Sequence, residues 1–161
     1  MKGSKFPEID FSRLALPPAD LKIVRRNNVY KVFDPLRKDF FCLTDEEFVR
    51  QIFTAYLINH LGYPPSVMAN EIGINLNNTL KRCDTVVFSS AGTPLMILEY
   101  KAPSVRISQE VFNQIVRYNM VLKAPYLVVS NGYTIYCCKI KYEEMNFQFL
   151  TQIPQYSEIK E

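Results

Sequence analysis

Short stretches in which apolar and polar residues alternate recur along the chain, and this pattern predicts a fold with many β-strands. Asn27-Asn28 and Asn131-Gly132 are dipeptides that favour tight hairpin turns between such strands. Residues 76–79, which include Asn77-Asn78, are predicted to form a loop instead. The predicted strands cover residues 21–26, 29–33, 40–43, 66–75, 83–88, 95–101, 126–130, 133–140 and an edge strand at 147–150.

Two other stretches carry apolar residues at helical spacing. The first begins after Thr44, which can cap a helix, and Glu47 three residues later completes the pattern of a capping box. Ser108 can cap the second helix, which ends before Pro125. The order of strands, helix, three strands, helix and two strands predicts an α/β or α+β domain. We expect a mixed central sheet flanked by helices.

Composition narrows this picture in a few respects. A chain of 161 residues suits one domain, and 48% hydrophobic with 22% charged residues excludes general disorder. The net charge of +3 permits a nucleic-acid partner without requiring one. Four cysteines without a C-x-x-C pair, and a single histidine, argue against a zinc site or a disulfide framework. Without a signal peptide or a run of roughly 20 apolar residues, we expect a cytoplasmic protein and no membrane contact.

The candidate chemistry lies in the predicted strands 83–88 and 95–101. A hairpin there can bring Asp84 beside Glu99, while alternation points Glu99 and Lys101 to the same side. Two carboxylates in an apolar sheet need a partner, and Mg²⁺ (or Mn²⁺) suits this pair. A nearby lysine can orient a metal-bound water. The set indicates metal-assisted phosphodiester hydrolysis, and the alternative is a surface ion pair between Lys101 and one carboxylate.

Several motifs, taken in their order along the chain, resemble a known family. The set resembles the N-terminal nuclease domain of the type I restriction enzyme R subunit, which belongs to the PD-(D/E)xK nuclease superfamily. The resemblance covers roughly residues 20–140 and implies a restriction-endonuclease-like α/β core preceded by an N-terminal β-hairpin. The motifs that carry it are E-x-x-R-Q at Glu47, Arg82-Cys83-Asp84, Glu99-Tyr100-Lys101-Ala102-Pro103, Q-x-x-x-Y from Gln114 to Tyr118, and Ser130-Asn131-Gly132.

The resemblance implies a role for each residue of the central motifs. Asp84 and Glu99 would bind the divalent metal, and the backbone carbonyl of Tyr100 would complete its ligands. Lys101 would position the attacking water and offset developing charge. Glu47, from the first helix, would support the metal site, although its place in the capping box offers a purely structural role.

A second group of residues is implied to contact nucleic acid. Gln114 and Tyr118 match the Q-x-x-x-Y motif, and their alternative roles are a polar boundary residue and a core aromatic. Arg82 precedes the strand that carries Asp84, where it can steer a phosphate toward the metal site. The alternative is that it belongs to a basic loop edge without a role in binding. Cys83 takes the place of the proline that names the superfamily, a departure that many members share.

These observations predict a metal-dependent DNA endonuclease. The sequence has no G-x-x-x-x-G-K-[ST] loop and is too short for an ATP-driven motor, so a separate motor or specificity subunit is a candidate partner beside DNA. The expected layout is an N-terminal arm (1–20), the nuclease-like domain (21–140), and an edge segment with a frayed tail (141–161). The rival hypothesis is a non-catalytic DNA-binding or partner-docking module on the same fold.

Overall fold

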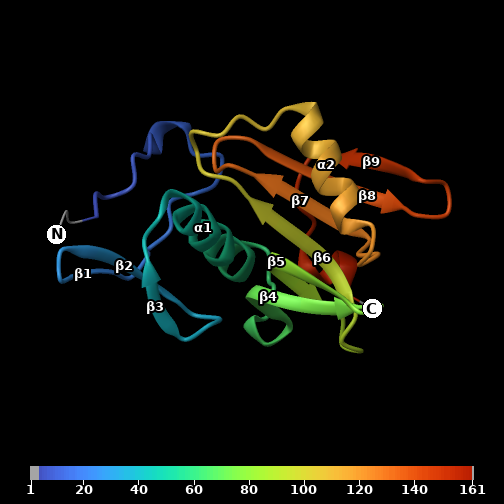
Figure 1. The fold of residues 1–161 in the computed structure, drawn as a ribbon, viewed down its shortest axis with the longest axis horizontal. Coiled ribbons are helices and arrows are strands. Elements are labelled where there is room, and N and C mark those ends of the chain that lie inside the picture. Colours follow the sequence, from blue (N-terminus) through green and yellow to red (C-terminus); the bar gives the residue numbers. More distant parts are fainter. Residues whose placement is uncertain (1–3, 161) are drawn as a thin grey trace.

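Nine β-strands form two sheets in the computed structural model, which describes residues 4–160 (Figure 1). The smaller sheet is antiparallel and contains the predicted N-terminal hairpin, with strands β1 (Ile23–Arg26), β2 (Val29–Asp34) and β3 (Asp39–Cys42). In the larger sheet only β6 and β7 run parallel among the described pairs, so the sheet is mixed. Its strands, in spatial order, are β4 (Met68–Leu76), β5 (Thr79–Phe88), β6 (Pro94–Tyr100), β7 (Tyr126–Ser130), β8 (Ile135–Lys141) and β9 (Asn146–Leu150).

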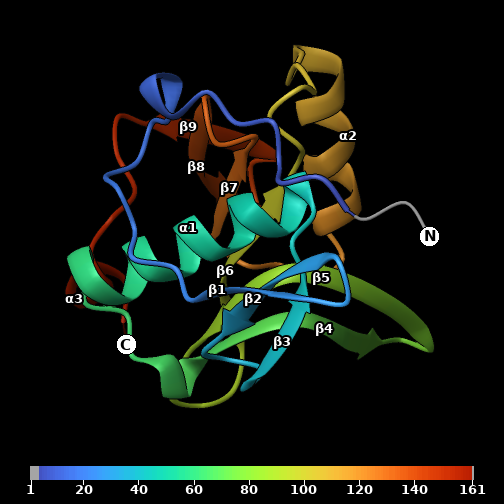
Figure 2. The ribbon, with the colours of Figure 1, turned by 90° about the vertical axis from the view of Figure 1, so that its left-hand side faces the viewer.

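Helices cover both faces of the larger sheet, as Figures 1 and 2 show. Helix α1 (Asp45–His60) lies on one face together with the smaller sheet, and helix α2 (Gln109–Asn119) lies on the other. Each face has its own buried apolar cluster, because alternate strand residues point to opposite sides. The α1 side contains Val32, Val49, Phe53, Leu57, Val87, Met96, Leu98, Tyr100 and Val128, whereas the α2 side contains Cys83, Val86, Ile97, Phe112, Val116, Leu127, Val129 and Cys138.

Asparagine pairs form two of the hairpin turns. Asn27 and Asn28 have φ values of 49° and 61°, which is the left-handed conformation of a two-residue turn, as predicted. Asn77 and Asn78 adopt the same conformation at 49° and 64°. They join β4 directly to β5, so the predicted loop at residues 76–79 is shortened to a two-residue hairpin turn and its outer residues belong to the strands.

The helix starts follow the predicted caps with one difference. The Thr44 hydroxyl accepts a hydrogen bond from the Glu47 backbone N–H at 3.0 Å, and the Ser108 hydroxyl does the same for Val111 at 3.2 Å. The Glu47 side chain, however, bonds to arginine and glutamine side chains instead of closing a capping box. Only half of the predicted box therefore forms.

Both ends of the described chain pack against the core. Leu16 is buried, and the backbone of Ala15 donates to the carbonyl of Gly132 at 2.9 Å. The predicted frayed tail is wrong, because a short helix α3 (Tyr156–Ile159) follows β9 and buries Ile159. Short 3₁₀ turns occur at Phe11–Arg13 and Pro65–Val67. Within residues 4–160, no helix combines the length and apolar character needed to cross a bilayer.

Candidate active site

The β5–β6 hairpin places the two predicted metal-binding carboxylates opposite each other. Thr85 pairs with Leu98, and in this register the next opposing pair is Asp84 and Glu99. The Asp84 carboxylate accepts a hydrogen bond from the Tyr100 backbone N–H at 2.8 Å. Asp84 is therefore held in place by the strand that carries Glu99.

Strand alternation breaks at Asp84. Cys83 packs on the α2 side, whereas Thr85 lies on the α1 side, where its hydroxyl bonds to Asn70 and Tyr100. Across the β4–β5 pair, Glu71 has a φ of 52°, an uncommon left-handed conformation for a residue of this size. Both irregularities fall at one level of the sheet, the level that carries Asp84.

Glu99 lies on the α2 face of the sheet and is largely buried. Its Oε1 atom has no hydrogen-bond partner within the described residues, and the side chain is 15% exposed. Burial, followed by the charge of the nearby Asp84, raises the pKa of Glu99 to about 8, while Lys81 and Lys101 oppose this shift. An additional cation at this carboxylate would relieve both the burial cost and the repulsion.

Lys81 and Tyr118 cover one side of Glu99. The Lys81 ammonium lies 3.7 Å from Glu99 Oε1 and 2.8 Å from the centroid of the Tyr118 ring. Burial lowers the pKa of Lys81, against the opposing effect of Glu99. Lys81 thus contacts both a predicted metal ligand and a predicted nucleic-acid contact.

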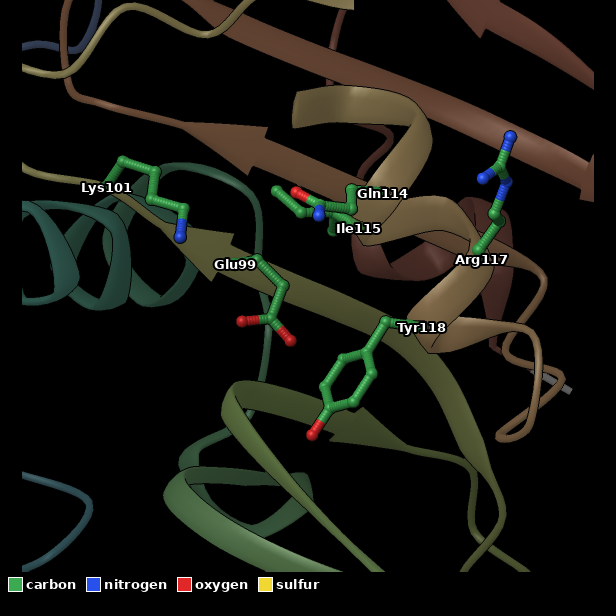
Figure 3. Close-up of a pocket in the computed structure, with 6 residues that line it drawn as sticks. All are labelled: Glu99, Lys101, Gln114, Ile115, Arg117 and Tyr118. Atoms are coloured by element: carbon green, nitrogen blue, oxygen red, sulfur yellow. The ribbon is translucent and has the colours of Figure 1, made fainter. Parts of the chain in front are cut away.

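A pocket of about 580 Å³ opens between the end of β6 and helix α2 (Figure 3). Glu99 and Lys101 line it from the β6 side, and Figure 3 shows the Lys101 ammonium directed toward the space beside the Glu99 carboxylate. Gln114 and Tyr118 line it from α2, because residues four apart share a helix face. The structure therefore brings these four predicted residues to one pocket, together with Ile115 and Arg117.

Glu47 belongs to a separate ionic network. Its carboxylate pairs with Arg37 and Arg50 and accepts from the Gln51 amide at 3.0 Å. Arg50 in turn pairs with Glu71 and lies 3.5 Å from Asp84. Among the described contacts, Glu47 is linked to Asp84 through Arg50, so its carboxylate is not brought beside the other two.

Glu46, the residue before Glu47, is influenced electrostatically by Asp84. Burial and the Asp84 and Glu71 carboxylates raise the pKa of Glu46, and Arg50 and Lys101 counter them. Glu46 lies in the first turn of α1, where its side chain is partly exposed and partly desolvated, and nothing in its sequence position distinguishes it from its neighbours. Arg50 was open to detection, since it lies three residues after Glu47 in the E-x-x-R-Q motif and therefore shares its helix face.

The two remaining predicted residues have other described contacts. Arg82 is 73% exposed and pairs with Glu71 at 2.7 Å, outside the pocket lining. The Tyr100 side chain is buried on the α1 side, where its hydroxyl donates to Thr85 at 2.8 Å. The ligand role predicted for Tyr100 concerns only its backbone carbonyl and stays a prediction.

The donor set is compatible with a hard divalent cation. No group of three or more His, Cys, Asp or Glu side chains suited to a metal occurs in residues 4–160, so the fit rests on two carboxylates. Mg²⁺ commonly uses one or two protein carboxylates and keeps several waters. The partnerless Glu99 Oε1 atom beside Asp84 meets that requirement.

The fold and the pocket define a class of protein. A mixed sheet flanked by helices, with a small N-terminal sheet, is the restriction-endonuclease-like α/β core that the motifs predicted. The pattern of the type I restriction enzyme R protein N terminus family (HSDR_N) matches residues 45–154. The chain belongs to this family, which confirms the resemblance.

A solved structure supports the fold independently. It is a fragment of an HsdR subunit of a type I restriction enzyme from Vibrio vulnificus YJ016, with a TM-score of 0.50 and 16% sequence identity. The match covers 71% of this chain and 24% of that chain, so it spans about a quarter of the solved fragment. No curated protein matches the sequence.

Proposed function

We propose that this protein is a metal-dependent endonuclease that hydrolyses DNA phosphodiester bonds at Asp84, Glu99 and Lys101. One observation carries the proposal. Glu99 lies opposite Asp84 at the end of a hairpin and shares a pocket with Lys101, yet its buried Oε1 atom has no hydrogen-bond partner in the described structure. A buried carboxylate oxygen left without a hydrogen bond is costly, and such groups are concentrated at functional sites.

Each residue has a role in this proposal. Asp84 and Glu99 would hold Mg²⁺ or Mn²⁺, with the Tyr100 carbonyl as a further ligand. When bound, the cation stabilises charge on the phosphate and lowers the pKa of water. Lys101 would orient the attacking water and offset negative charge as the new P–O bond forms and the bond to the leaving oxygen breaks. Gln114 would contact the DNA from helix α2.

The test is a cutting assay on linear, supercoiled, single-stranded and branched DNA, with Mg²⁺, Mn²⁺ or a chelator. Wild-type protein is compared with Lys101→Ala and Glu99→Gln, because both side chains line the pocket and glutamine keeps the size of Glu99. We expect metal-dependent cutting that both substitutions reduce by at least about 100-fold. Unchanged cutting by Lys101→Ala would reject the mechanism.

A second function is favoured by a different observation. Arg50 lies 3.5 Å from Asp84 and Lys81 lies 3.7 Å from Glu99, so each carboxylate already has a cation nearby. In a non-catalytic module that binds DNA, or docks on a motor or specificity subunit, these protein cations would be enough to compensate the two carboxylates without a metal. Calorimetric titration with Mn²⁺ separates the two functions, since such a module has no requirement for metal.

A further inference from the structure

Lys81 is an unusual lysine for the end of a hairpin. Only 3% of its side chain is exposed, although lysine is almost never fully buried unless it is paired. Its Nζ atom has no hydrogen-bond partner among the described residues, and the 3.7 Å separation from Glu99 Oε1 is an ion pair without a hydrogen bond. A long flexible side chain normally places its ammonium in water, so this buried position needs an explanation.

The surroundings of the ammonium supply one. The ring of Tyr118, which extends from α2, lies against Lys81 and separates it from solvent on that side. The face of an aromatic ring attracts a cation, and the attraction grows when the cation is desolvated. Glu99 and Tyr118, which both line the pocket, therefore hold the charge of Lys81 next to its lining.

We propose that Lys81 is a positioning residue that acts as an internal counter-ion for Glu99 and competes with the divalent cation for this carboxylate. The inference rests on the proposed function, because it concerns the same carboxylate. Lys81 keeps Glu99 compensated within the apolar sheet when no metal is bound. The cost is that a divalent cation entering beside Glu99 meets a fixed positive charge a few ångströms away.

The sign of the effect distinguishes this role from a structural one. A lysine that merely supported the site would, on removal, loosen Glu99 and weaken metal binding. A competing counter-ion has the opposite effect, since removing a like charge at this distance favours the incoming cation. We expect the neutral variant Lys81→Met, which keeps the apolar stem against Tyr118, to bind Mn²⁺ about tenfold more tightly.

The experiment measures Mn²⁺ binding to the intact chain by calorimetry, with free Mn²⁺ counted by electron paramagnetic resonance. Lys81→Arg keeps the charge and should stay within about twofold of the wild-type affinity. Lys139→Met is the matched control, because Lys139 is also a strand lysine that faces a tyrosine ring, at 5.7 Å from Tyr126, but this ring, unlike that of Tyr118, does not line the pocket. Lys81→Gln is a second neutral variant, and thermal unfolding of each variant verifies folding.

The outcomes distinguish a failure of the counter-ion role from a failure of the proposed metal-dependent function. If wild-type protein binds Mn²⁺, and Glu99→Gln does not, an equal or weaker affinity of both neutral Lys81 variants overturns the inference alone. If neither the wild type nor any variant binds, the metal site is absent and both proposals are rejected. Tighter binding, or binding that emerges only in the neutral variants, supports the counter-ion role.

Discussion

Two charged clusters meet at Asp84 and differ in how fully their members are paired. On the α1 side, Glu47 contacts two arginines and an amide. On the α2 side, Glu99 has a single ammonium at 3.7 Å and a buried oxygen without a hydrogen bond in the described structure. Two buried carboxylates, one on helix α1 and one on strand β6, thus have different environments.

The difference teaches which carboxylate can take a ligand. A carboxylate whose acceptor positions are filled by guanidinium and amide donors contributes to the fold, and removing its partners leaves a buried charge. A carboxylate with an open acceptor position lowers stability by itself and gains when a cation arrives. Sequence motifs alone do not distinguish the two, since Glu47 and Glu99 were both candidate site residues.

The largest expected effect comes from the arginine at the centre of the paired cluster. Arg50→Met leaves Glu47 and Glu71 without their shared partner, and we expect a loss of about 3–5 kcal/mol in unfolding free energy. Arg82→Met is the control, since Arg82 also pairs with Glu71 but is 73% exposed and should cost less than about 1 kcal/mol. Urea denaturation measures both, and equal losses would contradict a buried, structural network.

A matched pair of substitutions tests the comparison directly. Glu47→Gln removes the charge that compensates two arginines, and should cost about 1–3 kcal/mol. Glu99→Gln removes a charge that lacks a hydrogen bond at Oε1 but leaves the buried Lys81 ammonium without its carboxylate, so it should cost less than Glu47→Gln, about 1 kcal/mol. Measured in chelator by urea denaturation, the reverse order would show that the clusters have been assigned the wrong way round.

Acid should weaken the paired cluster through Asp34. Burial alone would raise the pKa of Asp34, but hydrogen bonds from Asn70, Arg37 and the backbone of Leu36 outweigh it and lower this pKa below its ordinary value. The stabilisation is therefore present above the unfolded-state pKa near 4 and is lost as the pH falls below it.

Asp34→Asn should remove this component. Unfolding free energies measured between pH 7 and pH 2.5 should fall less steeply for the variant, which also starts from a lower value because it loses the Arg37 pair. Parallel pH profiles for the two proteins would show that another carboxyl group is responsible.

The smallest expected effect on the fold is at the pocket wall. Gln114 is exposed and makes no described hydrogen bond, so Gln114→Ala should leave unfolding free energy within about 0.5 kcal/mol of wild type. Its affinity for DNA, measured by fluorescence anisotropy in chelator, should fall several-fold. Gln109→Ala on the same helix, outside the pocket, should leave DNA affinity unchanged.

Much of the fold was predictable because its signals are local. Asn27-Asn28 marked a hairpin between two β-rich strands, and Thr44 and Ser108 marked helix starts. The same asparagine dipeptide at residues 77–78 was missed, since the adjoining strand is interrupted by glycine and polar residues that obscure its period. The C-terminal helix was missed because its four residues carry too few periodic positions.

The candidate site also contains residues that local signals predict and contacts that they do not. Asp84, Glu99 and Lys101 were visible because a single hairpin brings them together. Arg50 could be found from the E-x-x-R-Q motif, but its contact with Asp84 could not, because Arg50 reaches Asp84 from another element. The contact of Arg50 with Glu71 was hidden as well, because Glu71 has a left-handed backbone conformation that its residue type does not predict. Lys81 had a weak signal, since alternation places it on the same side of its strand as the buried Cys83.

The hydrogen bond between Asp84 and the Tyr100 backbone N–H has an evolutionary consequence. A lineage released from selection for activity would retain Asp84 for as long as the sheet must form, because its carboxylate completes the strand end. No comparable hydrogen bond to the backbone is described for the Glu99 or Lys101 side chain, and Glu99 lowers the stability of the fold when no ligand is bound. Among descendants that have lost the proposed activity, positions 99 and 101 should change first, and a surviving aspartate at 84 would say little about whether that activity is present.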